Sequence, residues 1–399
     1  MKKKCLVFIL SILATICVCV GFTACELGFY EYNNGGNNSS DNSQNQGNNS
    51  GNNNQNQGSN YSNFIFSGSS VRAVNTSISG AIVIPSEHNG TTITTIPANA
   101  FKDCTNITSI EVPESVTSIG AGAFSGCSAL IDVTLPFVGS NRGNYGLPAA
   151  LFGYIFGSTS YEGGSMVEQY SPLKNTFYIP ATLQSVTITN ETAIGQGAFQ
   201  NCSMLTEINL NNEITKVGIS SFENCDNIAE INLPGITSIP SYLFKGCTSL
   251  SNFTISDSVN TIDSSIFAGC TGITSVEVPE SVTSIGAGAF SGCSALIDIT
   301  LPFIGSQKGN YNSATALFGY VFGTTSYEGG TKVEQHSPLK NTFYIPSTLR
   351  IVKITNEIVI GDGAFQNCSM LTSLTINTRA QDFVGVNAFE NTVIPVWAD

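Results

Sequence analysis

The chain has 399 residues, of which 11% are charged and 41% hydrophobic, so it is long enough to bury a sizeable core. Its formal net charge is −13; without the three lysines of the first 24 residues, 12 basic and 28 acidic residues remain, a charge of −16. This excess of acid excludes nucleic acid as the expected partner, because phosphate binding requires a basic surface.

The first 24 residues have the pattern of an export signal. Residues 2–4 are lysines, residues 6–20 are apolar, and a small residue precedes Cys25. This order resembles a bacterial lipoprotein signal, which implies a lipid on Cys25 that holds the protein on the outer face of a membrane. Phe22 departs from that pattern, because the position usually carries an aliphatic residue. Plain secretion and an uncleaved apolar anchor over residues 5–22 are the alternatives.

A low-complexity segment follows the signal. Within residues 33–63 only Asp41 and Tyr61 are not Asn, Gln, Gly or Ser. Such a composition cannot bury apolar surface, so residues 33–63 are expected to stay disordered, within a lipid-anchored linker that spans residues 25–63. A flexible coil of this length has a mean reach of roughly 30 Å, which would lift the folded part off the membrane.

Cysteines mark a repeat in the remainder of the chain. From Cys104 to Cys368 their successive spacings are 23, 75, 23, 22, 23, 23 and 75 residues. A period of 22–23 residues lies inside the leucine-rich repeat range. Because a single coil cannot close a core but stacked coils can, residues 64–399 are predicted to form a repeat solenoid of the leucine-rich type.

Each repeat unit indicates where its strand and turns lie. In the first unit Ile110 and Val112 alternate with a glutamate, as in a short strand with one buried face. Pro113 ends that strand, and Gly120 permits a turn that a side chain would obstruct. The fold class expected is an α/β solenoid of short stacked parallel strands, turns and short helical segments. Further strands are predicted at residues 81–84, 131–135, 185–189, 208–210, 231–233, 253–255, 276–278, 299–301, 352–354 and 374–376.

The two ends of the array are expected to differ from the middle. Residues 64–78 resemble a hairpin that would cap the N-terminal coil. Near Val393 the repeat fades, with Thr392 where a cysteine would stand, which predicts a C-terminal cap.

A longer period is superimposed on the short one. Residues 104–202 match residues 270–368 at an offset of 166, and the segment 111–127 recurs unchanged as 277–293. Each block carries 52 residues beyond one coil, which places insertions at 137–179 and 303–345.

The repeat unit identifies a family. The pattern Ala-Phe-x-x-Cys-x-x-Leu/Ile-x-x-Ile-x-Val-Pro-x-Ser-Val-x-x-Ile-Gly resembles the BspA-like leucine-rich repeats over roughly residues 80–395. Such repeats occur in surface proteins of host-associated bacteria and of trichomonads. The resemblance implies a solenoid that takes part in adhesion and offers no catalytic residues to transfer.

The insertions are the candidate binding elements, because long excursions in repeat arrays usually emerge on the binding face. Their aromatic and Gly-rich segments favour exposed contact loops. The opposing interpretation is that the apolar run at residues 151–156 folds back as a small side core, and that the Gly-rich segments are buried too. The candidate binding residues are Tyr161, Glu162, Tyr170, Tyr327, Glu328 and His336.

The eight repeat cysteines favour a structural role. Recurrence at one position of the coil is typical of buried thiols packed beneath a phenylalanine, although an exported location would also permit disulfides. No Cys-x-x-Cys pair occurs, so no metal is expected. His88 and His336 are expected to be solvated, and no nucleophile, zinc-protease or phosphate-loop motif is present.

The sequence therefore predicts a non-enzymatic surface protein without a cofactor, an adhesin that contacts a host or microbial protein or glycan. The alternatives are a structural envelope lipoprotein and a carbohydrate-binding module that uses the Tyr-rich insertions.

Overall fold

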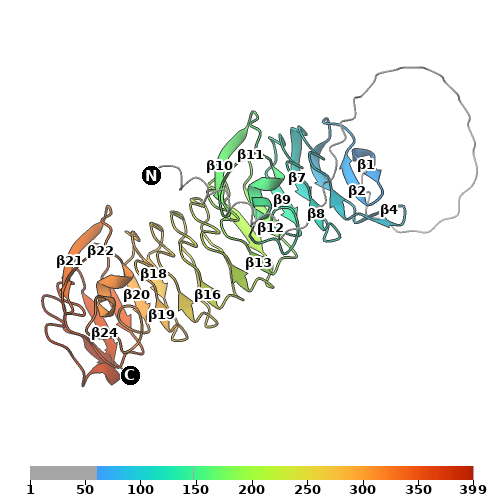
Figure 1. Ribbon diagram of the computed structural model, residues 1–399. Coiled ribbons are helices and arrows are strands. Elements are labelled where there is room, and N and C mark those ends of the chain that lie inside the picture. The colour runs from blue at the N-terminus through green and yellow to red at the C-terminus, as the bar shows by residue number, and fades with distance from the viewer. Residues whose placement is uncertain (1–60, 147, 399) are drawn as a thin grey trace, which may run out of the picture. The chain divides into compact units, whose positions relative to one another are not determined.

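The computed structural model describes residues 61–146 and 148–398, which form a stack of coils whose short strands pair in parallel sheets (Figure 1). The predicted solenoid is confirmed. The export signal, Cys25 and the linker up to residue 60 lie outside the described residues. Across the described ranges, no helix has the length and apolarity needed to span a bilayer.

The first strand of each coil builds the main parallel sheets. One five-stranded sheet consists of β3 (Ser79–Val83), β7 (Asn106–Glu111), β9 (Asp132–Leu135), β12 (Ser185–Ile188) and β14 (Glu207–Leu210). The second consists of β18 (Ser275–Glu277), β20 (Asp298–Leu301), β23 (Ile351–Ile354), β24 (Ser373–Asn377) and β25 (Val396–Ala398). Apolar side chains of these strands alternate inward, as the repeat pattern predicts.

The strands predicted at 231–233 and 253–255 do not form. An isolated bridge between Glu230 and Asn252 takes the place of the strand ladder here, while backbone bonds such as that from the N–H of Ser251 to the carbonyl of Ala229 still join the coils. The interruption coincides with the coil in which the cysteines, Cys225 and Cys247, are 22 rather than 23 residues apart, so one residue fewer spans the same path.

Most coils have a second, shorter strand, and these strands pair in three short parallel sheets that follow one another as a second strand column along the stack. Its members are β6 (Thr95–Ile96), β8 (Ser118–Ile119), β13 (Ala193–Ile194), β15 (Lys216–Val217), β16 (Ser238–Ile239), β17 (Thr261–Ile262) and β19 (Ser284–Ile285).

The predicted helical segments are single 3₁₀ turns, and the described residues contain no α-helix. They are η1 (Tyr61–Asn63), η2 (Pro148–Ala150), η3 (Phe152–Ile155), η4 (Ala314–Ala316), η5 (Phe318–Val321) and η6 (Thr378–Ala380). The repeated Ala-Phe segment of an ordinary coil is a hydrogen-bonded turn, in which the N–H of Cys127, for example, donates to the carbonyl of Phe124.

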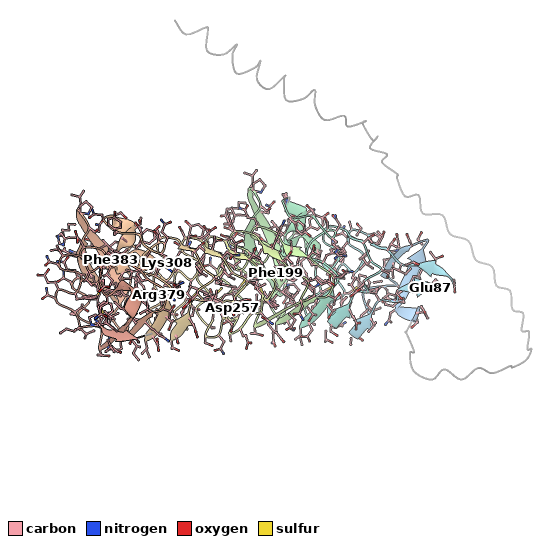
Figure 2. The ribbon with its side chains drawn as sticks, turned by 90° about the horizontal axis from the view of Figure 1, so that it is seen from below. Glu87, Phe199, Asp257, Lys308, Arg379 and Phe383 are labelled. Atoms are coloured by element: carbon pink, nitrogen blue, oxygen red, sulfur yellow. The ribbon has the colours of Figure 1, made fainter. Side chains whose placement is uncertain are left out.

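A column of phenylalanine rings fills the interior. Phe199 and Phe222 stack with centroids 5.8 Å apart, and Phe222 and Phe244 with centroids 5.7 Å apart. Phe199 lies inside the stack in Figure 2. Each ring packs on the ring of the neighbouring coil, so the column makes one continuous hydrophobic core.

The glycine after the second strand is required by close contact between coils. A Cβ added to Gly120 would lie 2.2 Å from the backbone nitrogen of Ala98 in the preceding coil. The equivalent Gly218 and Gly286 meet the same obstacle at 2.4 Å. The glycine therefore sets how tightly the coils stack.

The two ends of the stack are built differently. At the N-terminal end β1 (Phe64–Ser67) and β2 (Ser70–Ala73) form the expected hairpin, and β2 continues the second strand column by pairing with β6. A smaller hairpin, β4 (Glu87–His88) and β5 (Thr91–Thr92), lies beside it.

The last described coil departs from the repeat. β25 extends the main sheet, Val386, Ile394 and Val396 are exposed, and the hydroxyl of Thr392, in the place of a cysteine, donates to the carbonyl of Cys368 at 2.9 Å. The C-terminal cap near Val393 stays a prediction.

Candidate binding surface

The structure divides each predicted insertion into a coil and a hairpin. Residues 148–156 rejoin the stack, where the buried Phe152 packs on Phe199 at 5.1 Å and Phe156 packs on Phe124 at 6.4 Å. The run is buried, as the opposing interpretation expected, but it joins the main core and does not form a separate side core. The equivalent Phe318 does the same in the second block.

The segments that leave the stack are two antiparallel hairpins. β10 (Gly164–Tyr170) pairs with β11 (Lys174–Pro180), and β21 (Gly330–His336) pairs with β22 (Lys340–Pro346). Figure 1 shows both hairpins on the same side of the stack.

A buried glutamine fixes each hairpin to the stack. The Gln169 side chain is 0% exposed; its Oε1 accepts the N–H of Gly153 and its Nε2 donates to the carbonyl of Ala198, both at 2.9 Å. Gln335 makes the same two bonds, to Gly319 and Ala364, at the same distances. Because every polar atom is paired inside the core, each hairpin has a defined position.

The outer face of the first hairpin is mainly apolar. Met166, Tyr170 and Leu173 are exposed. The only charges on this face are those of Glu168 and Lys174, which form an ion pair at 2.5 Å.

The outer face of the second hairpin is more basic. Glu334 binds Lys332 at 3.0 Å and Lys340 at 2.7 Å. These two lysines lower the pKa of the Glu334 carboxyl to about 2. His336 occupies the position of Tyr170, and its Nδ1 lies 2.8 Å from Oε1 of Gln366.

Of the predicted binding residues, Tyr161 and Tyr327 lie at the bases of the hairpins, whereas Tyr170 and His336 are exposed at the ends of β10 and β21, next to the turns. The rings of Tyr161 and Tyr327 are half-buried, and burial raises the pKa of both phenols. The hydroxyl of Tyr161 is buried without a hydrogen-bond partner, whereas that of Tyr327 donates to the carbonyl of Tyr344. Glu162 and Glu328 are exposed beside them.

The actual tips were missed in the sequence. Leu173 and Leu339 occupy them, and each is 75% exposed. The available signal was the Ser-Pro-Leu-Lys stretch between two runs of alternating polarity, which occurs identically in both blocks.

The eight repeat cysteines are free and buried, as predicted. The thiol of Cys247 donates to the carbonyl of Phe222 at 3.0 Å, and Cys270 does the same to Phe244. Burial raises the pKa of Cys104 to about 11 and that of Cys247 to about 12. Unreactive, packed thiols are what a structural column requires. In the described ranges no group of three His, Cys, Asp or Glu residues could hold a metal ion.

His88 is not simply solvated. Its ring stacks on Phe66 with centroids 3.9 Å apart and lies 5.4 Å from that of Tyr61. It therefore belongs to the packing of the N-terminal end.

The family described as "BspA type Leucine rich repeat region" matches the chain in six copies, over residues 94–146, 173–302 and 336–395. A leucine-rich cell surface protein of Faecalibacterium prausnitzii A2-165 is 21% identical, with 84% of this chain and 74% of that one covered and a TM-score of 0.35. A leucine-rich repeat protein of Bacteroides ovatus ATCC 8483 is 19% identical, with 84% and 88% covered and a TM-score of 0.36. No curated protein matches the chain.

Proposed function

Because the chain belongs to the BspA type leucine-rich repeat family, we propose that it is a non-enzymatic surface protein that adheres to a host or microbial macromolecule through its two hairpins. A stack of coils provides a long, rigid support. The hairpins add contact surface that can vary without disturbing the core.

The observation that carries this proposal is the pair of identical exposed tips. The stretch Ser-Pro-Leu-Lys-Asn-Thr-Phe-Tyr-Ile-Pro is the same in both hairpins, and its leucine is 75% exposed in each. Other exposed positions have changed between the blocks, as at Met166 and Lys332. A solvent-facing leucine contributes nothing to the core and is free to contact a partner, which supports binding at both tips.

The spacing of the hairpins supports binding at two points. Equivalent strands β9 and β20 are six coils apart, so the hairpins are separated by roughly 29 Å along the stack. A partner that repeats its epitope at this distance would engage both tips, and the second contact would form at high effective concentration.

The proposed location is the outer face of a bacterial membrane, with the lipid on Cys25 as the anchor. Fractionation tests this directly. Cys25→Ser should move the protein from membranes to the medium, and retention of the variant on membranes would contradict lipid anchoring.

The binding test uses the purified full chain against immobilised host matrix proteins, whole bacterial cells and a glycan panel. Leu173→Ser with Leu339→Ser should lower binding at least tenfold relative to the native chain, since loss of an anchor at each tip removes both contacts. Each single variant should bind with an affinity between those of the native chain and the double variant. Val83→Ser, which changes an exposed apolar residue on the coil body, is the matched control.

Each outcome favours one function. Unchanged binding by the double variant would overturn the role of the tips. Binding to glycans alone would favour a carbohydrate-binding module, although the half-buried Tyr161 and Tyr327 offer little ring surface for stacking. No binding in any class would favour a structural envelope lipoprotein.

A further inference from the structure

We infer that a groove between the last two coils binds a cationic side chain, a lysine or an arginine, of a basic peptide segment. The groove has a volume of about 310 Å³ and is lined by Tyr311, Asn312, Asp362, Asp382 and Phe383. This site is separate from the hairpins and does not depend on their function. Figure 2 shows Phe383 at the C-terminal end of the stack.

The floor of the groove is backbone. Ile360 and Val384 pair in parallel, and Gly361 and Gly385 follow them in the two coils. A Cβ on Gly385 would lie 2.4 Å from the nitrogen of Asp362, so only glycine keeps this floor low. The N–H of Val386 donates to Oδ1 of Asp362 at 2.7 Å, which orients that carboxylate.

The walls are two exposed aromatic rings. Tyr311 is 61% exposed and Phe383 is 64% exposed, although both line a hollow. In the first block the equivalent Tyr145 is tied down, because its hydroxyl donates to Glu191 at 2.8 Å.

A different hydrogen-bond arrangement accounts for the free tyrosine of the second block. Glu357, the counterpart of Glu191, is buried and accepts the backbone N–H groups of Ile304 at 3.0 Å and Gly309 at 2.8 Å. These backbone N–H groups occupy both oxygens of the Glu357 carboxylate. The ring of Tyr311 is exposed at the surface.

The charge of the groove points to a cation. After the first block Val217 pairs with Ile194, and after the second block Val384 pairs with Ile360 in the same way. These two pairs show that Val384 corresponds to Val217. On this alignment Gln196 and Thr215 are replaced by Asp362 and Asp382, and Lys216 by Phe383. The formal charge of the three positions changes from +1 to −2.

Aromatic faces and carboxylates together select an ammonium or guanidinium group. The ring quadrupole attracts a cation, and a carboxylate accepts its hydrogen bonds. A neutral sugar can also stack on the rings and donate its hydroxyls to the carboxylates, but only a cation gains Coulombic attraction from the two negative charges. The basic residues Lys308 and Arg379 are both directed to Asn356, with their nitrogens 2.6 and 3.2 Å from its Oδ1.

The experiment measures binding of the full chain to a short, blocked Arg-containing peptide by calorimetry at low salt. The uncharged twin of that peptide carries citrulline in place of arginine. The native chain should bind the arginine peptide and not the citrulline twin, and added salt should weaken binding. Asp362→Asn with Asp382→Asn should weaken it roughly tenfold, since an exposed charge pair contributes modestly and two such pairs are lost together.

Matched variants make the test decisive. Phe383→Lys restores the residue of the first block and should abolish binding, whereas Asp263→Asn, an exposed acid elsewhere on the same strand column, should leave it unchanged. Equal binding of the citrulline peptide, or an equal loss in Asp263→Asn, would overturn the proposal. If the native chain bound neutral glycans and Phe383→Lys abolished that binding, the proposal would also be overturned, and a sugar site would be favoured. The Leu173→Ser, Leu339→Ser variant should bind the peptide normally, which separates this result from that of the hairpins.

Discussion

The two duplicated blocks, residues 104–202 and 270–368, have the same interior, while their exteriors share the hairpin tips and differ at other positions. Gln169 and Gln335 make matching buried bonds at equal distances, and Phe152 and Phe318 occupy the same place in the ring column. On the surface, Tyr145 is hydrogen-bonded while Tyr311 is exposed. Close packing restricts which side chains can replace one another inside the coils, so differences in charge and hydrogen bonding between the blocks arise on the surface.

The largest expected effect tests whether the interiors are energetically equivalent. Phe152→Ala and Phe318→Ala should each destabilise the fold by about 3–5 kcal/mol, because each leaves a cavity in the ring column. Urea unfolding followed by circular dichroism measures the loss. Phe383→Ala, at an exposed ring, is the control and should stay within about 0.5 kcal/mol of the native chain. A loss confined to one block would break the equivalence.

A smaller effect is expected at the buried glutamines. Gln169→Leu leaves the N–H of Gly153 and the carbonyl of Ala198 without partners, at a cost of about 1–3 kcal/mol. Gln335→Leu should behave alike. Hydrogen exchange should show faster exchange at Gly153 or Gly319 and along the attached hairpin. Exchange rates equal to those of the native chain would show that the glutamine does not hold the hairpin in place.

The smallest effect distinguishes the two hairpin surfaces. The pKa of Glu334 is lowered to about 2 by Lys340 and Lys332, so its ionised form stabilises the folded state. That contribution is complete above pH 4.5 and decreases as the pH falls towards 2. Thermal unfolding of Glu334→Gln should therefore differ from the native chain at pH 6 and approach it near pH 2. A difference that persists undiminished at pH 2 would contradict the assigned ion pairs.

The sequence predicts the coils well because their determinants are local. Spacing of cysteines, alternation at Ile110 and Val112, and Pro113 lie within one unit, and each acts on its immediate neighbours. The left-handed backbone before the cysteines follows the same rule, since that position is held by glycine, asparagine or aspartate, as at Gly126 and Asn201.

The insertions could not be resolved this way, because their fold depends on contacts far apart in the chain. Gln169 meets Ala198, and Phe152 meets Phe199, only once the coils have stacked. From the sequence alone, the glycines at 163 and 164 predict an exposed loop. In the structure a Cβ on Gly164 would lie 2.9 Å from the ring of Tyr161, so the glycine makes room for a packed side chain.

The groove was also outside the reach of the repeat pattern. The last coil has one additional residue before Thr392. At the fixed offset of 166, Lys216 is therefore aligned with Asp382 and not with Phe383. Only the pairing of Ile360 with Val384 shows which positions correspond.

The ladder of thiols has a consequence for where the protein can mature. Each of the eight repeat cysteines is held as a packed, protonated side chain, and Cys127, for example, donates to the carbonyl of Phe101 at 3.2 Å. The coils of the described residues therefore need neither an oxidant nor a disulfide isomerase to reach their final state. Its stability should be the same in air, under strict anaerobiosis and in the presence of reducing agents, so that the coils tolerate changes in redox conditions that would unfold a surface protein stapled by disulfides.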